Sequence, residues 1–209
     1  MKLVVVVAAE RVTFRYADVP VLRAVDLRVE PASVTVVTGT NGSGKSTLLH
    51  LLAGLATPDE GHIRRRAGAR VALLPQRTSD IDALPLTVLD SVRIGRFTPG
   101  RLLRRLTRTD HAAVASAMEQ LGIAHLARRR LRELSGGQRQ RTLLAQTLVQ
   151  DADVYLLDEP TAALDVRSRQ RVHELLVERS RAGAAVVLAS HDQAEVSLAD
   201  RSLDLPAHA

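Results

Sequence analysis

Segments with the apolar spacing of strands alternate with segments that have the apolar spacing of helices along this chain of 209 residues. Continuous or every-second apolar positions predict strands, whereas apolar positions three or four residues apart predict helices. Strands are predicted at 3–8, 10–16, 25–29, 33–38, 70–74, 153–157 and 184–189. Helices are predicted at 48–55, 138–149 and 166–180, with a turn at 57–61. Continuous apolar strands separated by helices indicate an α/β fold with a mostly parallel sheet covered on both faces.

Residues 77–132 interrupt this rhythm. Apolar positions recur at helical spacing through Val88 and Val92, and again through Val114 and Met118. We therefore predict a helical insert within a chain whose length fits one domain.

The composition indicates an aliphatic core. Hydrophobic residues make up 45% of the chain and aromatic residues only 2%, so aliphatic side chains must fill the interior. The absence of cysteine excludes disulfides and thiolate metal sites. No apolar run approaches the roughly 20 residues that a membrane span needs. We interpret the apolar start, which ends at Ala9, as a strand rather than a signal peptide, and expect the protein to be soluble by itself.

The net charge of +6 raises the question of anionic partners. Much of the excess lies in two arginine clusters: Arg101, Arg104, Arg105 and Arg108, and Arg128, Arg129, Arg130 and Arg132. Neither cluster has interleaved aromatic residues that could stack on bases, so we expect no nucleic-acid partner. Solvated helix faces explain the clusters, and contact with a membrane or a membrane partner is the alternative. Lysine occurs only at Lys2 and Lys45.

A glycine-rich segment lies between the apolar strand ending at 37 and the apolar helix beginning at 48. Its glycines allow successive N–H groups to point at phosphate oxygens, and the helix start adds the positive end of its dipole. Lys45 can reach the β- and γ-phosphates, and the Ser46 hydroxyl can ligate Mg²⁺. The predicted phosphate loop comprises Gly39, Thr40, Asn41, Gly42, Ser43, Gly44, Lys45, Ser46 and Thr47.

Two adjacent acids follow the predicted strand 153–157. Asp158 can hold Mg²⁺, because hard cations prefer carboxylate oxygen. Glu159 can polarise an attacking water as a general base. A charged turn is the structural alternative, and the phosphate loop in the same chain favours the chemical interpretation.

A second group of backbone donors is predicted at the start of helix 138–149. Residues 134–140 read Leu-Ser-Gly-Gly-Gln-Arg-Gln, so Ser135 and the two glycines can present N–H groups at a helix start. One chain has little use for two phosphate-binding helix starts, whereas a nucleotide held between two copies uses both. With this signature segment, the chain resembles the ATP-binding subunits of ABC transporters over nearly its whole length.

The resemblance assigns roles to further residues in the family's order. Tyr16, with Phe14 as second choice, matches the aromatic residue that stacks on adenine. Gln76 matches the glutamine that senses Mg²⁺ and water, Asp165 the loop that meets the partner subunit, and His191 the histidine at the γ-phosphate. The candidate catalytic residues are Glu159, His191, Gln76 and Lys45; the metal ligands are Ser46, Gln76 and Asp158; the signature contacts are Ser135, Gly136, Gly137 and Gln138.

Two departures from the family pattern accompany these matches. Ala162 stands where the family often has serine. The chain ends 18 residues after His191, which leaves a complete last strand–helix unit in doubt and argues against a C-terminal regulatory domain.

The resemblance implies a phosphate-loop NTPase of the ABC type. A RecA-like core with an antiparallel N-terminal β-subdomain is expected at 1–76 and 133–209, and a helical subdomain at 77–132. Two copies would bind ATP and Mg²⁺ head to tail. The expected complex also includes membrane permease subunits and an extracytoplasmic solute-binding protein, with this chain peripheral at the cytoplasmic face of the membrane.

The stretch after Gln76 is the part of the sequence that bears on the cargo, although no cargo-binding residue lies in this chain. Arg77, the acids at 80 and 82, residues 84–88 and Gly95-Arg96 resemble the ATP-binding subunits of zinc and manganese importers. We therefore expect import of one of these metals, with iron-chelate import, other import and drug export as alternatives.

Two other classes of function are disfavoured. Only 88 residues separate Lys45 from Leu134, without sustained heptads, unlike chromosome-maintenance ATPases of this family. Translation-type relatives have two ATPase units, whereas this chain has one. Intact Lys45, Asp158, Glu159 and His191 argue against an inactive binding module.

Overall fold

The computed structural model describes residues 5–76, 85–97 and 105–206. These residues form two compact units. The first unit contains 5–76, 152–159 and 175–206, and the second contains 85–97, 105–151 and 160–174. The second unit thus continues beyond 132, where the expected helical subdomain ends, and the domain boundaries stay a prediction.

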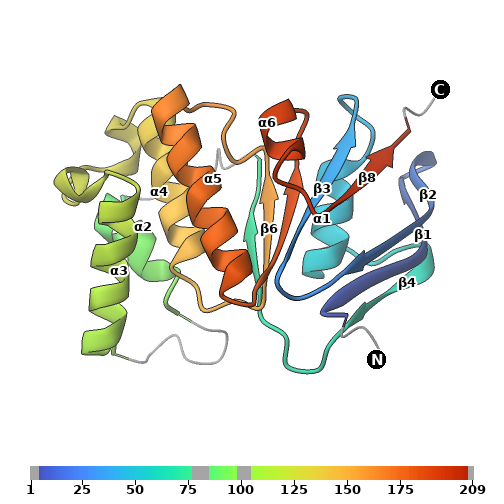
Figure 1. Cartoon of the computed structure of the whole chain (residues 1–209), viewed down its shortest axis with the longest axis horizontal. Coiled ribbons are helices and arrows are strands. Elements are labelled where there is room, and N and C mark those ends of the chain that lie inside the picture. The colour runs from blue at the N-terminus through green and yellow to red at the C-terminus, as the bar shows by residue number, and fades with distance from the viewer. Residues whose placement is uncertain (1–4, 77–84, 98–104, 207–209) are drawn as a thin grey trace. The chain divides into compact units, whose positions relative to one another are not determined.

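The first unit contains two sheets (Figure 1). The antiparallel sheet has the order β2-β1-β4, and the parallel sheet has the order β5-β6-β7-β3-β8. The strands are β1 Val7–Tyr16, β2 Val19–Val29, β3 Ser33–Gly39, β4 Glu60–Arg65, β5 Val71–Leu74, β6 Val154–Asp158, β7 Ala185–Ala189 and β8 Arg201–Leu205. The predicted parallel sheet and antiparallel β-subdomain are confirmed.

Helices occur in both units. The first unit contains α1 Lys45–Ala53 and α6 Gln193–Val196, and the second contains α2 Val88–Ile94, α3 Arg108–Gln120, α4 Gly136–Leu148 and the short 3-10 helices η2 Ala124–Leu126 and η3 Leu131–Glu133. Helix α5, Val166–Arg181, begins in the second unit and ends in the first. Within the described ranges, no helix has both the length and the apolar character that a membrane crossing requires.

Helix α1 is at the centre of the first unit's core. Its leucines, Leu48, Leu49, Leu51 and Leu52, are fully buried. They form one cluster with apolar side chains from both sheets, among them Val12 and Val29 of the antiparallel sheet and Val37, Leu156 and Val187 of the parallel sheet. Burying each leucine contributes about 1.5–3 kcal/mol. This packing fixes the start of α1 at the end of β3.

Several elements differ in extent from the predicted ones. Strand β1 joins the end of the strand predicted at 3–8 to the strand predicted at 10–16, and its register shifts between Ala9 and Val12; residues 3 and 4 lie outside the described residues. Arg11 lies in this irregularity with a φ of 50°. Strand β2 begins at Val19 rather than at residue 25, and α1 begins at Lys45 rather than at residue 48.

Two strands were not predicted. Strand β4 replaces the end of the turn predicted at 57–61; most of its side chains are exposed, so no apolar alternation marks it. Strand β8 pairs in parallel with β3 and supplies the last strand that the sequence left in doubt. The segments 77–84 and 98–104, which include Arg77, Arg101 and Arg104, lie outside the described residues.

Candidate functional site

The phosphate loop connects β3 to α1 through two positions that exclude side chains. Gly39 has a φ of 140°, and a Cβ there would lie 2.5 Å from Ser43 Oγ and 2.6 Å from the Leu205 carbonyl oxygen. Gly44 caps α1 with a φ of 95°, and a Cβ there would lie 2.7 Å from a methyl carbon of Leu22. Only glycine fits both positions, so the loop has the narrow curvature that a phosphate cradle requires.

Two side chains of this loop lie inside it. Lys45 is only 6% exposed, and its Nζ donates to the carbonyl oxygens of Gly39 and Thr40, at 2.8 and 2.9 Å. The Ser43 hydroxyl is buried without a hydrogen-bond partner among the described residues. A buried hydroxyl normally has a partner. An inward-facing ammonium and an unpartnered hydroxyl fit a bound oxyanion.

Asp158, at the end of β6, is next to the phosphate loop. The hydroxyl of Ser46 hydrogen-bonds to its carboxylate. Burial raises the pKa of Asp158, and the neighbouring Glu159 acts in the same direction, whereas the Ser46 bond, His50 and Lys45 oppose the rise. A buried carboxylate paired with a hydroxyl oxygen has the donor chemistry that Mg²⁺ prefers.

Glu159 adopts a backbone conformation that is rare for a residue with a side chain. Its φ is 47°, and its N–H donates to the Ala189 carbonyl oxygen at 2.9 Å. Its Oε1 lies 3.5 Å from His191 Nδ1. The structure therefore brings together the predicted general base and the predicted γ-phosphate histidine.

Gln76 reaches the same edge of the parallel sheet. It follows β5, and Leu74 of β5 pairs with Leu157 of β6. The carboxyl ends of these neighbouring strands therefore place Gln76 near the strand end occupied by Asp158. Its side chain is exposed.

Tyr16 ends β1 in the antiparallel sheet. Its ring is 55% exposed and packs edge to face against Phe14, with ring centroids 5.0 Å apart. The ring is thus accessible for stacking, and the choice of Tyr16 over Phe14 stays a prediction.

The signature segment begins α4 in the second unit. Ser135 and Gln138 form a reciprocal capping box: the Gln138 N–H donates to Ser135 Oγ at 3.3 Å, and the Ser135 N–H donates to Gln138 Oε1 at 3.1 Å. Gly136 is exposed and a Cβ there would meet nothing within 4 Å. The helix start is therefore open to a ligand on the glycine side.

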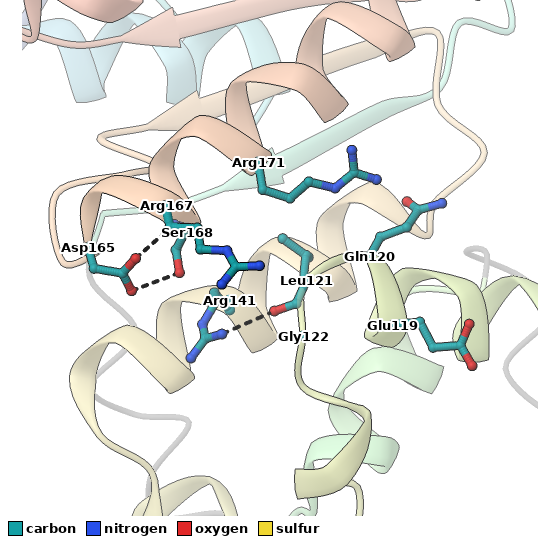
Figure 2. A pocket seen from close by; sticks show the side chains of 9 residues that line it. All are labelled: Glu119, Gln120, Leu121, Gly122, Arg141, Asp165, Arg167, Ser168 and Arg171. Atoms are coloured by element: carbon teal, nitrogen blue, oxygen red, sulfur yellow. Dashed lines mark hydrogen bonds between the residues drawn. The ribbon is translucent and has the colours of Figure 1, made fainter.

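Asp165 is also in the second unit, immediately before α5 (Figure 2). Its two carboxylate oxygens accept from the Ser168 N–H and the Ser168 hydroxyl, each at 2.8 Å. These two bonds, the N–H first, lower the pKa of Asp165. Asp165 therefore caps the helix of its own chain while its carboxylate remains at the surface.

Sequence reasoning missed two polar neighbours of these residues. His50 is one of the groups that oppose the rise in the pKa of Asp158. Gln140 of the signature segment donates to the Pro160 carbonyl oxygen at 2.9 Å. The spacing of Gln140 from Gly137 could have placed both residues on one face of the helix, but the sequence does not indicate that Gln140 bonds to Pro160. Within the described ranges, no three His, Cys, Asp or Glu residues cluster closely enough to hold a metal ion.

Comparison with known proteins gives consistent matches. A family model described as ABC transporter matches residues 22–162. The high-affinity zinc uptake system ATP-binding protein ZnuC of Bacillus subtilis (strain 168) is 36% identical over 91% of this chain and 86% of that protein. The manganese transport system ATP-binding protein MntB of the same strain is 34% identical over 89% and 77%. A solved structure assigned to the metal-chelate type of ABC transporter, in an inward-facing conformation, is 31% identical over 97% of this chain and 80% of that chain, with a TM-score of 0.83.

Proposed function

The chain belongs to the ABC transporter family, and from this membership we propose that it is the ATP-hydrolysing subunit of a membrane transporter that imports zinc or manganese. ATP binding and hydrolysis belong to the family's ATP-binding subunits. The choice of cargo is supported by the zinc and manganese transport proteins that the chain resembles over most of its length.

The observation that best supports hydrolysis is the arrangement of side chains around the end of β6. Asp158 bonds to Ser46 of the phosphate loop, and the next residue, Glu159, lies 3.5 Å from His191. Lys45 would exchange its two carbonyl acceptors for the β- and γ-phosphates. Glu159 would accept a proton from the attacking water, and His191 and Gln76 would orient the γ-phosphate and that water.

The residues around the phosphate loop also fit a magnesium ion. Ser46 and Asp158 would be its protein ligands, with Gln76 close by. Mg²⁺, when bound, neutralises charge on the phosphate oxygens. The Ser46–Asp158 hydrogen bond orients both oxygens before the nucleotide enters.

We further propose that two copies share each nucleotide. The open helix start at Ser135, Gly136 and Gly137 supports this, because the phosphate loop of the same chain already supplies a complete cradle. Ser135 and Gln138 of one copy would contact the γ-phosphate held by the other, and Asp165 would lie near the contact. Tyr16 would stack on the adenine ring.

The remaining proposed partners are integral membrane permease subunits and an extracytoplasmic solute-binding protein. The chain would be peripheral at the cytoplasmic face of the membrane. The helical subdomain expected at 77–132 would dock on the permease.

Mutation of the proposed base tests the catalytic assignment. We expect Glu159→Gln to bind ATP but to hydrolyse it about 10²–10⁴-fold more slowly, because an amide cannot accept the proton. Turnover is measured by phosphate release with and without Mg²⁺, and binding by calorimetry. Hydrolysis by this variant at the wild-type rate would remove Glu159 from its proposed role.

The metal content of cells tests the cargo separately. Deletion of the encoding gene should lower cellular zinc or manganese during metal starvation, and the wild-type gene should restore it, whereas the Glu159→Gln gene should not. Unchanged zinc and manganese in a strain without a second importer would reject the cargo and leave the ATPase assignment intact.

A further inference from the structure

One face of α4 contacts the 160–165 loop, which follows Glu159 in the chain. Gly137, Gln140 and Arg141 share this face, because residues three and four positions apart are neighbours on a helix. Gln140 Nε2 donates to the Pro160 carbonyl oxygen at 2.9 Å. A Cβ on Gly137 would lie 3.0 Å from the Ala163 carbonyl oxygen, so the loop packs closely against the signature segment.

Arg141 extends this contact toward Asp165. Its guanidinium donates to the carbonyl oxygens of Gly137 and Leu121, each at 3.4 Å. Its charge adds to the Ser168 hydrogen bonds that lower the pKa of Asp165. Arg141 and Asp165 line the same pocket of about 460 Å³, from α4 and from the start of α5 (Figure 2). The 160–165 loop is therefore bonded to α4 at Pro160, and its Asp165 end lies beside Arg141 in the same pocket.

The contact at Pro160 is the one that bears on catalysis, because Pro160 directly follows the proposed base, Glu159. The φ of 47° at Glu159 is costly for a residue with a Cβ, and such a conformation persists only where its surroundings hold it. On one side, the Glu159 N–H donates to Ala189. On the other side, proline has no N–H, so the Pro160 carbonyl is the only backbone group of that residue that can be held, and Gln140 holds it.

We propose that Gln140 is a positioning residue for Glu159. By donating to Pro160, its carboxamide keeps Glu159 in the left-handed conformation that directs the carboxylate toward the water. ATP turnover at Glu159 then depends on the hydrogen bond that Gln140 of α4 in the same chain makes to Pro160. This inference rests on the proposed function, since it takes Glu159 to be the base.

Two substitutions remove the donor. Gln140→Leu keeps the approximate size, and Gln140→Glu keeps the shape but cannot donate when ionised. We expect each to lower kcat about tenfold to hundredfold, as a displacement of a catalytic group by roughly 1 Å does, with KM and ATP affinity within about twofold of wild type. Gln146→Leu is the matched control on the same helix, because Gln146 accepts from Ser91 Oγ at 2.9 Å and does not bond to the loop. Its kcat should stay within about twofold of wild type.

A double-mutant cycle separates positioning from general structural damage. In a Glu159→Asp background, whose base is already displaced, Gln140→Leu should cost much less than in wild type. Unchanged kcat in both Gln140 variants, an equal loss in both backgrounds, or a loss expressed only in KM would overturn the inference. If Glu159→Gln is inactive while the Gln140 variants behave as wild type, the proposed function stands and only this inference fails.

Discussion

At Lys45 the ammonium group is already satisfied before any phosphate arrives. Its Nζ donates to the carbonyl oxygens of Gly39 and Thr40, and the side chain is almost completely buried. In the proposed function, nucleotide binding exchanges hydrogen bonds to two neutral carbonyl oxygens for hydrogen bonds to charged phosphate oxygens. Arginine, the usual cation of this chain, has a broad planar fork that would not fit between these two carbonyls.

Asp158 gives a prediction at the same scale. Burial raises its pKa above the ordinary 3.8, so the folded protein binds this proton more tightly than the unfolded chain does. Ionisation of Asp158 therefore lowers the free energy of unfolding. This loss is absent below about pH 3.8 and complete above the raised pKa. We expect Asp158→Asn, which is neutral and keeps an acceptor for Ser46, to melt above the wild type at about pH 7.5 without nucleotide. The gain should shrink as the pH falls through the raised pKa.

Thermal unfolding of the nucleotide-free protein over a pH series measures this difference. Asp165→Asn is the control of opposite sign, because hydrogen bonds lower the pKa of Asp165. That variant should melt no higher than the wild type at about pH 7.5. A lower melting temperature for Asp158→Asn at neutral pH would contradict the electrostatic explanation.

Among the elements, α2 and α4 approach each other closely at Gly95. A Cβ there would lie 2.2 Å from the Gln146 carbonyl oxygen and 2.7 Å from a methyl carbon of Val149. The next residue, Arg96, donates to the Val149 carbonyl oxygen at 2.7 Å and pairs with the buried Asp110 at 2.8 Å. Internal packing thus accounts for Gly95-Arg96, and the support for a metal cargo comes from the relatives as whole proteins.

Gly95→Ala tests this close approach. The added methyl group meets backbone that cannot move aside cheaply, so we expect a loss of about 1–3 kcal/mol in the free energy of unfolding. Gly136→Ala is the control for stability, since a Cβ there meets nothing within 4 Å. Denaturant unfolding measures both variants. Equal stability of Gly95→Ala and wild type would show that α2 and α4 can separate without cost.

The elements also show what the sequence can predict. Buried strands such as β6 and β7 were predictable because all of their side chains are buried and, apart from Asp158 at the end of β6, hydrophobic. Strand β4 was not predictable, because all of its residues except the half-buried Ile63 are exposed. The phosphate loop and signature segment are local motifs, so they can be predicted from the sequence alone. The bond from Gln140 to Pro160 and the left-handed Glu159 were not predictable, because distant parts of the chain impose them.

For the whole molecule, the proposed sharing of the nucleotide between two copies predicts that a variant can keep its affinity for ATP and still lose hydrolysis. Ser135→Arg places bulk and charge at the open helix start, whereas the phosphate loop is unchanged. We expect ATP affinity to stay within about twofold of wild type while hydrolysis falls by about 10²-fold or more, because the second copy cannot close. Calorimetry and phosphate release measure the two quantities.

Mixing variants extends this test. Ser135→Arg and Lys45→Ala should each be inactive alone, and a mixture should recover at most one working site in each mixed dimer. Normal hydrolysis by Ser135→Arg at concentrations where only monomer is present would disprove the shared site.

The scarcity of lysine turns Lys45 into a built-in reporter. The chain has only one lysine besides Lys2, and it lies in the first turn of the helix at the centre of the first unit's core. A protease specific for lysine can therefore cut the interior of the chain at one peptide bond only. While α1 is packed, that bond is protected, so its cleavage rate measures how often this part of the core opens. Nucleotide in the loop should slow the cleavage, without any label attached to the protein.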